Sequence, residues 1–512
     1  MSVSNAIGQE RVSRVIGYEL LAANFQESTP NLPMRMAILG QANTANQTGL
    51  TNTPRQVTSE AEAGEIWGYG SQIHIMMRII RSRFGDTTGG IPTVVYPQLP
   101  ATSAAAQVDT ITITGAATGA AVHFLRINGR TTLDGDSLAI SIANGDAVAD
   151  VASKIADAIN ACNSCPVSAS AALGVVTVTT KWADVTAGDL NISIDTDSRP
   201  VGLSYAIAES TAAAGDSTAN VTTSLGLFDE NWNTIVVNPY GKGLASVFET
   251  VNGVPGVATA TGRYAPAVFK PFVALTGDVT ADTVANVTAN LDADEATLVQ
   301  CPAPNSEGWP FEAAANVAAL LARQAQNSPH TDTAGSFYPD MPVPLDENIG
   351  VYNTYNNRDL IVKNGGSTVS LRNSRYVVED LVTTYHPTGQ NPPQFRYVRS
   401  LVQDWNVRFT YLLLQQDNVL DKAILADDQF TTQSNVIKPK QWRGLLTQMF
   451  EDLALRALIV DTAFSVASLQ VGIDPVNPDR INDFFRYKRS GFARIASTTA
   501  EAGFNFGTIS ST

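Results

Sequence analysis

The residues best suited to chemistry in this 512-residue chain are few and widely spaced. Cys162 and Cys165 form a Cys-x-x-Cys pair, but the chain has only one further cysteine, Cys301, and a structural zinc site needs four ligands. We therefore interpret the pair as two small side chains near the end of a helix. Redox or metal roles are the alternatives to this interpretation.

Other residue types give no stronger indication of a reactive site. The four histidines are His74, His123, His330 and His386. None of them pairs with another at helical spacing, and residues 40–44 lack the Gly-Lys-Ser/Thr ending of a phosphate-binding loop. Asp134-Gly135-Asp136 and Asp427-Asp428 lack the spacing of a calcium loop, so we expect solvated turns there. The sequence thus predicts no catalytic, cofactor or metal site, and a protein that is not an enzyme.

Charge and hydropathy restrict the possible partners. The formal net charge is −15, and an acidic surface repels both DNA and anionic lipid, so we expect no direct nucleic-acid binding. No apolar run approaches the ~20 residues of a membrane helix, and residues 1–29 lack the apolar stretch of a signal peptide. We therefore expect no membrane insertion. Only 16% of the residues are charged, which fits a protein that covers much of its surface with copies of itself.

The elements of the chain fall into a layered α/β part that is interrupted once. The expected strands are 36–39, 92–96, 234–237, 268–275 and 296–299. The expected helices are 59–83, 242–250 and 311–324. Their alternation predicts an α/β domain with a mostly parallel sheet, made of residues 31–100 and 226–345.

The interruption, residues 101–225, has a different character. Its strands alternate with period two, and acidic side chains outnumber basic ones. Asn128-Gly129, after an expected strand at 122–127, is a strong signal for a type I′ hairpin turn. An amphipathic helix near 148–161 follows, with strands at 175–180 and 190–194. We interpret 101–225 as an inserted, acidic, β-rich domain, because insertions are tolerated at exposed loops.

The last part and the two ends complete an α/β and α+β multidomain fold. Residues 346–490 form a helical α+β domain with expected helices at 397–422 and 441–459. The arms 1–30 and 491–512 each contain a strand-like run, at 15–21 and 492–496, with no partner close in sequence. Such a strand packs against its own domain or adds to a sheet of another copy. Strand addition between copies gives heterologous contacts, which build rings or helical filaments.

Residues 351–498 resemble the C-terminal part of the contractile tail sheath family. The resemblance rests on Asn356-Asn357-Arg358-Asp359 and on the segments 376–385, 398–414, 436–440 and 492–495. The inserted part resembles the insertion of Mu-like tail sheath proteins at 127–129, 144–146, 156–160 and 174–178. Each motif is short, but their order covers most of the chain and is fairly specific.

The resemblance implies a structural subunit of a virion tail, assembled in the host cytoplasm. Sheath subunits polymerise as stacked hexameric rings around a tail tube, and the sheath contracts to drive the tube through the host envelope for genome ejection. The implied partners are further copies of the chain, the tail tube protein, and the baseplate and tail terminator proteins. No cofactor is implied.

The same resemblance assigns roles to particular residues. The expected intersubunit strands include Val15, Ile16, Tyr18, Leu20, Phe492, Arg494 and Ile495. The C-terminal domain is expected to face the tube, with Lys438, Lys440 and Arg443 meeting an acidic tube surface; a solvated helix end is the alternative. The inserted domain is expected to face outward.

Two other classes of protein are alternatives to a tail sheath subunit. A secreted or surface-displayed β-rich binding protein is disfavoured by the absence of a signal peptide, and an α/β enzyme with an added binding domain lacks catalytic residues. Within the sheath class, a phage tail, a phage-tail-like bacteriocin and a secretion-system sheath stay open, and the single chain argues against the last.

Overall fold

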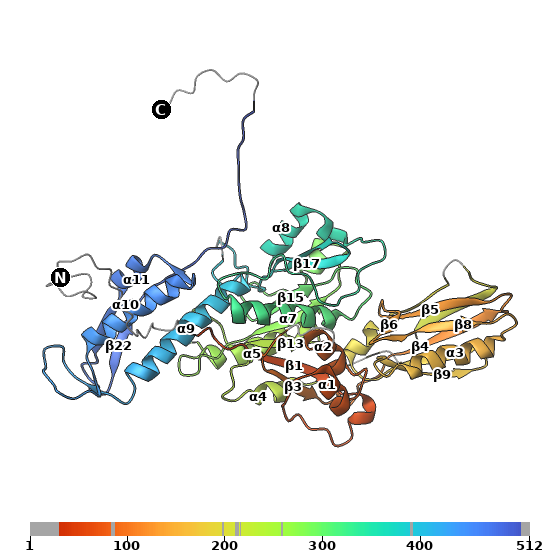
Figure 1. Cartoon of the computed structure of the whole chain (residues 1–512), viewed down its shortest axis with the longest axis horizontal. Coiled ribbons are helices and arrows are strands. Elements are labelled where there is room, and N and C mark those ends of the chain that lie inside the picture. Colours follow the sequence, from red (N-terminus) through yellow and green to blue (C-terminus); the bar gives the residue numbers. More distant parts are fainter. Residues whose placement is uncertain are drawn as a thin grey trace, which may run out of the picture.

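The computed structural model describes residues 30–82, 88–196, 199–209, 215, 217–257, 260–389 and 393–502. The molecule is elongated, and three parts follow one another along its long axis (Figure 1). The β-rich part with α3 lies at one end, the large sheet with α7 in the middle, and the helices α9 to α11 at the other end. The strand expected at 15–21, with Val15, Ile16, Tyr18 and Leu20, lies outside the described residues.

The central sheet has the strand order β15-β14-β13-β1-β3-β2. Its strands are β1 Met36–Gln41, β2 Arg55–Val57, β3 Thr93–Gln98, β13 Ile235–Asn238, β14 Val273–Asp278 and β15 Leu298–Pro302. All neighbouring strands run parallel except β2, which pairs antiparallel with β3. The mostly parallel sheet expected from the sequence is therefore present, and residues from both sides of the interruption share it.

Helices cover both faces of this sheet. The helices of the central part are α1 Glu60–Trp67, α2 Gln72–Ile80, α4 Thr222–Gly226, α5 Ala245–Asn252, α6 Val284–Val287, α7 Pro310–Asn327 and α8 Tyr355–Lys363. The helix α7 begins with Pro310 at its first position and is rich in alanine, which lets it lie close against β13 and β14. On the opposite face, Phe248 of α5 and Leu225 of α4 are buried against Phe228 and Phe272. A hairpin of β16 Thr368–Arg372 and β17 Arg375–Asp380 extends the α7 side.

Two sequence expectations in this part were wrong in their bounds. The single helix expected at 59–83 is two helices, α1 and α2, because Gly68 and Gly70 between them have positive φ values of 91° and 74°. The strand expected from residue 268 begins only at Val273. Phe269 has a φ of 37°, and Pro271 has no N–H to donate to a sheet.

The β-rich part has its own hydrophobic core, in which α3 packs on strands of two sheets. Its elements are β4 Val108–Gly115, β5 Ala121–Ile127, β6 Thr132–Leu133, β7 Asp136–Ser137, β8 Ala139–Ile142, α3 Val148–Ala161, β9 Val167–Ala172, β10 Val175–Thr180, β11 Ile192–Asp195 and β12 Leu203–Glu209. The predicted turn is confirmed, because Asn128 and Gly129 both have positive φ, 44° and 75°. The predicted helix 148–161 is also confirmed.

This β-rich part meets the central part at one of its ends. Trp182 lies in the central core, with its ring 4.8 Å from that of Trp309. Gln72 Nε2 at the start of α2 donates a hydrogen bond to Thr186 Oγ1, 2.8 Å away. The expected domain limits of 101–225 thus include residues that pack in the central core, Leu225 among them.

The junction lies at the carboxyl end of β1 in the central sheet. The chain moves from β1 to β3 on one side and to β13 on the other, so the strand order reverses between β1 and β13. Open α/β sheets commonly hold ligands at the carboxyl ends of such strands. Here Gln41 ends β1 and its N–H donates to Gln72 Oε1, while Gln72 in turn reaches Thr186. Residues of the interruption therefore close the crevice.

The C-terminal part is built on α9 Val398–Asn418, α10 Pro439–Leu455 and α11 Thr462–Ser468. Its short strands are β18 Ala423–Ile424, β19 Val436–Ile437, β20 Ile459–Val460, β21 Gln470–Ile473, β22 Ile481–Phe484 and β23 Lys488–Arg489. Its core centres on Trp442, Leu446 and Phe450 of α10. Both long helices were expected, with ends a few residues away. Among the described residues, no helix combines the length and apolar character that crossing a membrane requires.

Candidate assembly surfaces

The C-terminal segment, residues 490–502, begins at a site where α9 holds its backbone. Arg399 Nη1 donates to the carbonyl oxygen of Ser490 and Nη2 to its hydroxyl oxygen, both at 2.9 Å. Gln403 Nε2 donates to the same hydroxyl at 2.7 Å, and the N–H of Ser490 donates to Leu458 O at 3.1 Å. The start of the segment is therefore fixed to the body by several hydrogen bonds.

Arg494 is a second anchor of this segment. Its guanidinium forms ion pairs with Asp332 and with Asp380, the latter at 2.7 Å, and lies over the ring of Tyr397 at 4.0 Å. The side chain of Asp332 is 2% exposed. Burial raises the pKa of Asp332, and Arg494 opposes that shift. Of the expected linking residues, Arg494 thus holds the segment to its own chain.

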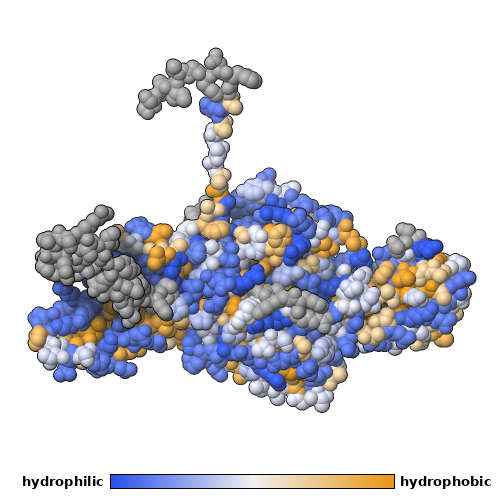
Figure 2. All heavy atoms as spheres, in the orientation of Figure 1, coloured by the Kyte–Doolittle hydropathy of each residue, from blue (hydrophilic) through white to orange (hydrophobic). Residues whose placement is uncertain are grey.

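Beyond Arg494 the segment leaves the body. Ile495 is 85% exposed, and residues 495–502 are exposed throughout. In Figures 1 and 2 the segment stands clear of the rest of the molecule as an extended trace. The strand expected at 492–496 does not form within the chain, and residues 491–502 contain no strand. Whether Phe492 and Ile495 join a strand between copies stays a prediction.

The described chain begins beside the same helix. The N–H of Leu32 donates to Asn406 Oδ1 of α9 at 2.9 Å. Asn31 Nδ2 donates to Gln326 O at 3.0 Å, and Arg456 Nη2 donates to Asn31 Oδ1 at 2.9 Å. The first described residues and the base of the C-terminal segment are thus both tied to the junction of the central and C-terminal parts.

The hairpin β21–β22 is an edge that could receive a strand. Among the described residues, each of its strands pairs only with the other. Phe484 is 49% exposed, and Val476 in the connecting turn is 89% exposed. A two-stranded hairpin with unpaired outer edges presents free N–H and C=O groups to an added strand.

The three expected tube-facing residues lie near the start of α10, in different surroundings. Lys440 and Arg443 are exposed, and the backbone N–H of Lys440 donates to Asp427 Oδ1 at 2.8 Å. Lys438 Nζ donates to the carbonyl oxygen of Gln429, so its charge is directed toward the 425–435 loop. Lys440 and Arg443 are therefore the two that present a positive charge outward.

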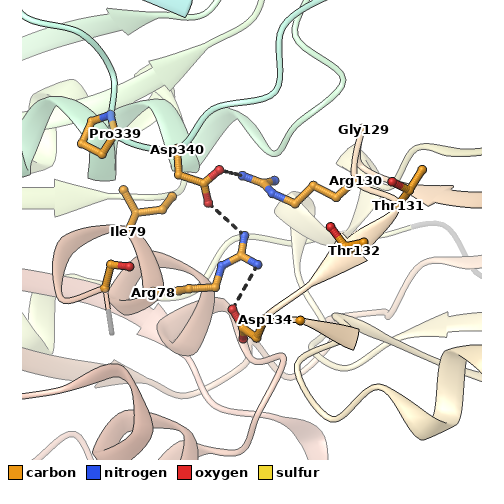
Figure 3. Close-up of a pocket in the computed structure, with 11 residues that line it drawn as sticks. Arg78, Ile79, Gly129, Arg130, Thr131, Thr132, Asp134, Pro339 and Asp340 are labelled. Carbon is orange, nitrogen blue, oxygen red and sulfur yellow. Dashed lines mark hydrogen bonds and ion pairs between the residues drawn. The ribbon is translucent and has the colours of Figure 1, made fainter. Parts of the chain in front are cut away.

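An ionic cluster that is buried except at Asp340, and that sequence reasoning missed, joins the β-rich part to the central part; Figure 3 shows its members other than Glu312. Its members are Arg78, Arg130, Asp134, Glu312 and Asp340. Arg130 Nη1 lies 2.9 and 2.8 Å from the two carboxylate oxygens of Glu312, and Arg130 Nη2 lies 3.2 Å from Asp340 Oδ1. Arg78 Nη2 lies 3.4 Å from Asp340 Oδ2. A pocket of about 670 Å³ opens beside the cluster.

Electrostatics explains why Arg130 and Glu312 can be buried. Burial alone would lower the pKa of Arg130, but Glu312 and Asp340 together raise it above its ordinary value. The Glu312 side chain is only 1% exposed, so an unpaired charge there would be costly. Arg130 and Glu312 are 182 residues apart in the sequence. No local sequence pattern therefore reveals the cluster.

The cysteines and His123, which were candidates for chemistry in the sequence, are buried, and His123 has hydrogen-bond partners. Cys162, Cys165 and Cys301 are buried and free, and burial raises the pKa of the Cys165 thiol to about 12. His123 lies in β5 between Tyr205 Oη and Arg199 O, at 2.7 and 2.9 Å. In the described part of the chain, no group of three or more His, Cys, Asp or Glu could hold a metal ion.

Comparisons with known proteins give structural neighbours only. No protein-family profile and no curated protein sequence matches this chain. Solved structures similar to it include the sheath tail protein from Desulfitobacterium hafniense, at 13% identity and a TM-score of 0.44, covering 92% of this chain and 100% of that one. A chain in the cryo-EM structure of the six-fold symmetrised anti-feeding prophage baseplate is similar at 9% identity and a TM-score of 0.44, covering 96% and 100%.

A sheath tail protein is thus among the structural neighbours of this chain. Since both TM-scores lie below 0.5, we base the functional proposal on the chain's own residues and contacts.

Proposed function

We propose that this chain is the structural subunit of a contractile tail sheath. The observation that carries the proposal is the C-terminal segment, which is anchored by Arg494 and then extends, exposed, away from its own body. It lies at the end of residues 351–498, the region whose sequence resembles the C-terminal part of tail sheath proteins. A fixed base with a free extended end is the form that a link to another subunit requires.

Such links join copies in one direction. The segment of one copy adds as a strand to a sheet edge of the next, and β21–β22 supplies edges unpaired among the described residues. The donor and the acceptor are different surfaces, so the contact is heterologous and builds rings or helical filaments. The resemblance to tail sheath proteins implies that the array consists of stacked hexameric rings. The N-terminal arm, residues 1–30, makes the second link.

The array surrounds a tail tube and contracts without a nucleotide. Contraction is a rigid-body rearrangement of subunits into more extensive contacts, while the arms keep neighbours connected. Even about 1 kcal/mol gained per subunit, small beside the energy of a typical interface residue, sums to a large driving force over many copies. The result is movement of the tube through the host envelope and genome ejection.

The two ends of the molecule take different positions in this arrangement. The C-terminal part faces the tube, and Lys440 and Arg443 meet an acidic tube surface, because both charges are exposed at the start of α10. The β-rich part, at the opposite end of the long axis, faces outward. The further partners are the baseplate and tail terminator proteins at the two ends of the tail, which the sheath subunits also contact in the virion.

Negative-stain electron microscopy tests the proposal directly. The purified chain is imaged alone and after co-expression with its tail tube protein. We expect striated hollow cylinders, or sheathed tubes of two distinct lengths. Monodisperse particles under both conditions would reject the sheath, and a β-rich binding protein displayed on a surface would then be the better explanation.

A further inference from the structure

An aromatic groove lies where the central part meets α9 and the end of the C-terminal part. Its volume is about 370 Å³. The rings that line it are Tyr264, Phe269, Phe395, Trp405, Tyr411, Phe485 and Tyr487. They come from segments on both sides of the junction, so the groove exists only when the two parts are packed together.

The groove contains the guanidinium of Arg408, which forms no ion pair with any described residue. The guanidinium of Arg408 on α9 is 5.8 Å from the ring centroid of Phe269 and 5.7 Å from that of Tyr411. Its Nη1 is buried and has no hydrogen-bond partner, and among the described residues no carboxylate forms an ion pair with it. A guanidinium has five N–H donors and is costly to desolvate unpaired.

The other charges of the groove are satisfied, which makes Arg408 exceptional. Asp404 pairs with Arg489 at 2.5 Å and accepts a hydrogen bond from Tyr487 Oη at 2.9 Å. No anion of the groove is therefore left over for Arg408. The arrangement fits an incoming segment that carries one carboxylate and apolar or aromatic side chains.

The projecting C-terminal segment has this chemistry. Glu501 is exposed and is the single acidic residue between positions 495 and 512. Phe504 and Phe506 follow it in the sequence, and in an extended chain three residues span about 10 Å. The described part of the segment leads away from its own body, so a groove on another copy is the one it can meet.

We propose that the groove of one copy binds residues 501–506 of a second copy, with Glu501 pairing with Arg408 and Phe504 entering between the aromatic rings. This inference rests on the proposed function in one respect, namely that copies of the chain associate. It adds a side-chain anchor, specific for a carboxylate and an aromatic ring, to links that depend on backbone pairing.

Binding of a peptide tests the groove without requiring assembly. A fluorescently labelled peptide of residues 497–508 is titrated with the full-length protein, which carries Glu501→Gln so that its own segment competes less. We expect saturable binding that is at least about tenfold weaker for peptides with Glu501→Gln or Phe504→Ala. Equal affinity of the altered and unaltered peptides, or no binding of either, would overturn the proposal.

Variants of the receptor separate a binding role of Arg408 from a structural one. Arg408→Met removes a half-buried guanidinium whose buried Nη1 has no hydrogen-bond partner, so we expect a Tm equal to or above that of the parent, together with a similar tenfold loss of peptide affinity. The matched control is Arg55→Met on the exposed edge strand β2, which we expect to bind like the parent. A lower Tm with unchanged affinity would assign Arg408 to the fold.

Microscopy of full-length variants completes the test and keeps the two proposals distinguishable. We expect Arg408→Glu and Glu501→Arg each to prevent cylinders and the double variant to restore them. Cylinders from all three would overturn the groove and leave the sheath standing. Absence of cylinders from the wild type would overturn the sheath, and the peptide titration would still decide the groove. Stronger binding by a peptide of residues 10–21 would assign the groove to the N-terminal arm instead.

Discussion

Removing Arg130 tests whether the buried ionic cluster holds the β-rich part to the central part. Arg130→Ala leaves the carboxylate of Glu312, which is 1% exposed, without its partners at 2.8 and 2.9 Å. The nearest remaining cation is Arg78, with Nη2 at 3.8 Å from Glu312 Oε1. Breaking a buried pair by removing one partner costs about 3–5 kcal/mol, and partial compensation by Arg78 favours the lower end, about 3 kcal/mol.

A double variant that lacks both charges distinguishes this cost from lost packing. Arg130→Met combined with Glu312→Leu removes both charges, and we expect it to cost about 1 kcal/mol or less. The matched control is Arg126→Met, which breaks a partly exposed pair with Asp195 at 3.7 Å in the same β-rich part. We expect that change to cost less than about 1 kcal/mol.

Urea denaturation followed by tryptophan fluorescence measures these differences. Trp182 and Trp309 lie at the junction with their rings 4.8 Å apart, so their emission reports on its opening. Hydrogen exchange of α7 gives an independent measure, because Glu312 lies in its first turn. A loss below about 1 kcal/mol for Arg130→Ala, or a double variant as unstable as the single one, would refute the reasoning.

Three further predictions concern pH, the tube and the arm. Burial, with help from Glu249, raises the pKa of Glu295 to about 8, so the folded state keeps a proton that the unfolded state releases above pH 4.5. We therefore expect stability that is greater at pH 5 than at pH 9, by on the order of 2 kcal/mol, and Glu295→Gln to flatten the urea midpoint across this range. Lys440→Glu with Arg443→Glu should weaken co-sedimentation with the tube protein at low salt, and unchanged co-sedimentation would exclude this contact. Ser497→Pro removes a ladder hydrogen bond beyond the Arg494 anchor, so we expect folded monomers without cylinders; normal cylinders would exclude strand addition there.

The placement of that proline shows what the structure adds to the sequence. From the sequence alone, proline at Arg494 would be chosen to break the expected strand at 492–496. The structure shows that Arg494 pairs with Asp380 and Asp332, so changing it would also release the base of the segment. A proline at Ser497 keeps the anchor and alters only the exposed part.

Local signals predicted local structure well. The helix 148–161 has the bounds that its apolar spacing indicated, and the turn at Asn128-Gly129 has the two positive φ values that its residue types favour. Strand–helix alternation likewise predicted the parallel sheet. These features depend on residues within a few positions of one another, where periodicity and turn chemistry act.

The misses involve contacts between residues that are distant in sequence, and a strand-like run that pairs with no strand of its own chain. The break between α1 and α2 depends on Gly68, where an added Cβ would lie 2.5 Å from Asn43 Cβ, a contact invisible to helical periodicity. The ionic cluster joins α2, the turn after β5 and the start of α7, so no window of sequence contains it. The run at 492–496 has strand-like residues but no strand within the chain, because a strand needs a neighbour.

The β-rich part is attached to the central part at one end. The turns that contain Gly115, Gly174 and Gly202 lie together at the other end of this part. There, the N–H of Gly145 donates to Ala117 O, and Gly174 lies against Val148. In mechanical terms it is a beam fixed at its root, and a beam loaded at its tip carries its greatest bending moment at that root. The root is where Trp182 packs on Trp309 and Arg130 pairs with Glu312. A sideways force on the tip is therefore borne by a few buried contacts, and their stiffness sets how far the tip moves relative to the body.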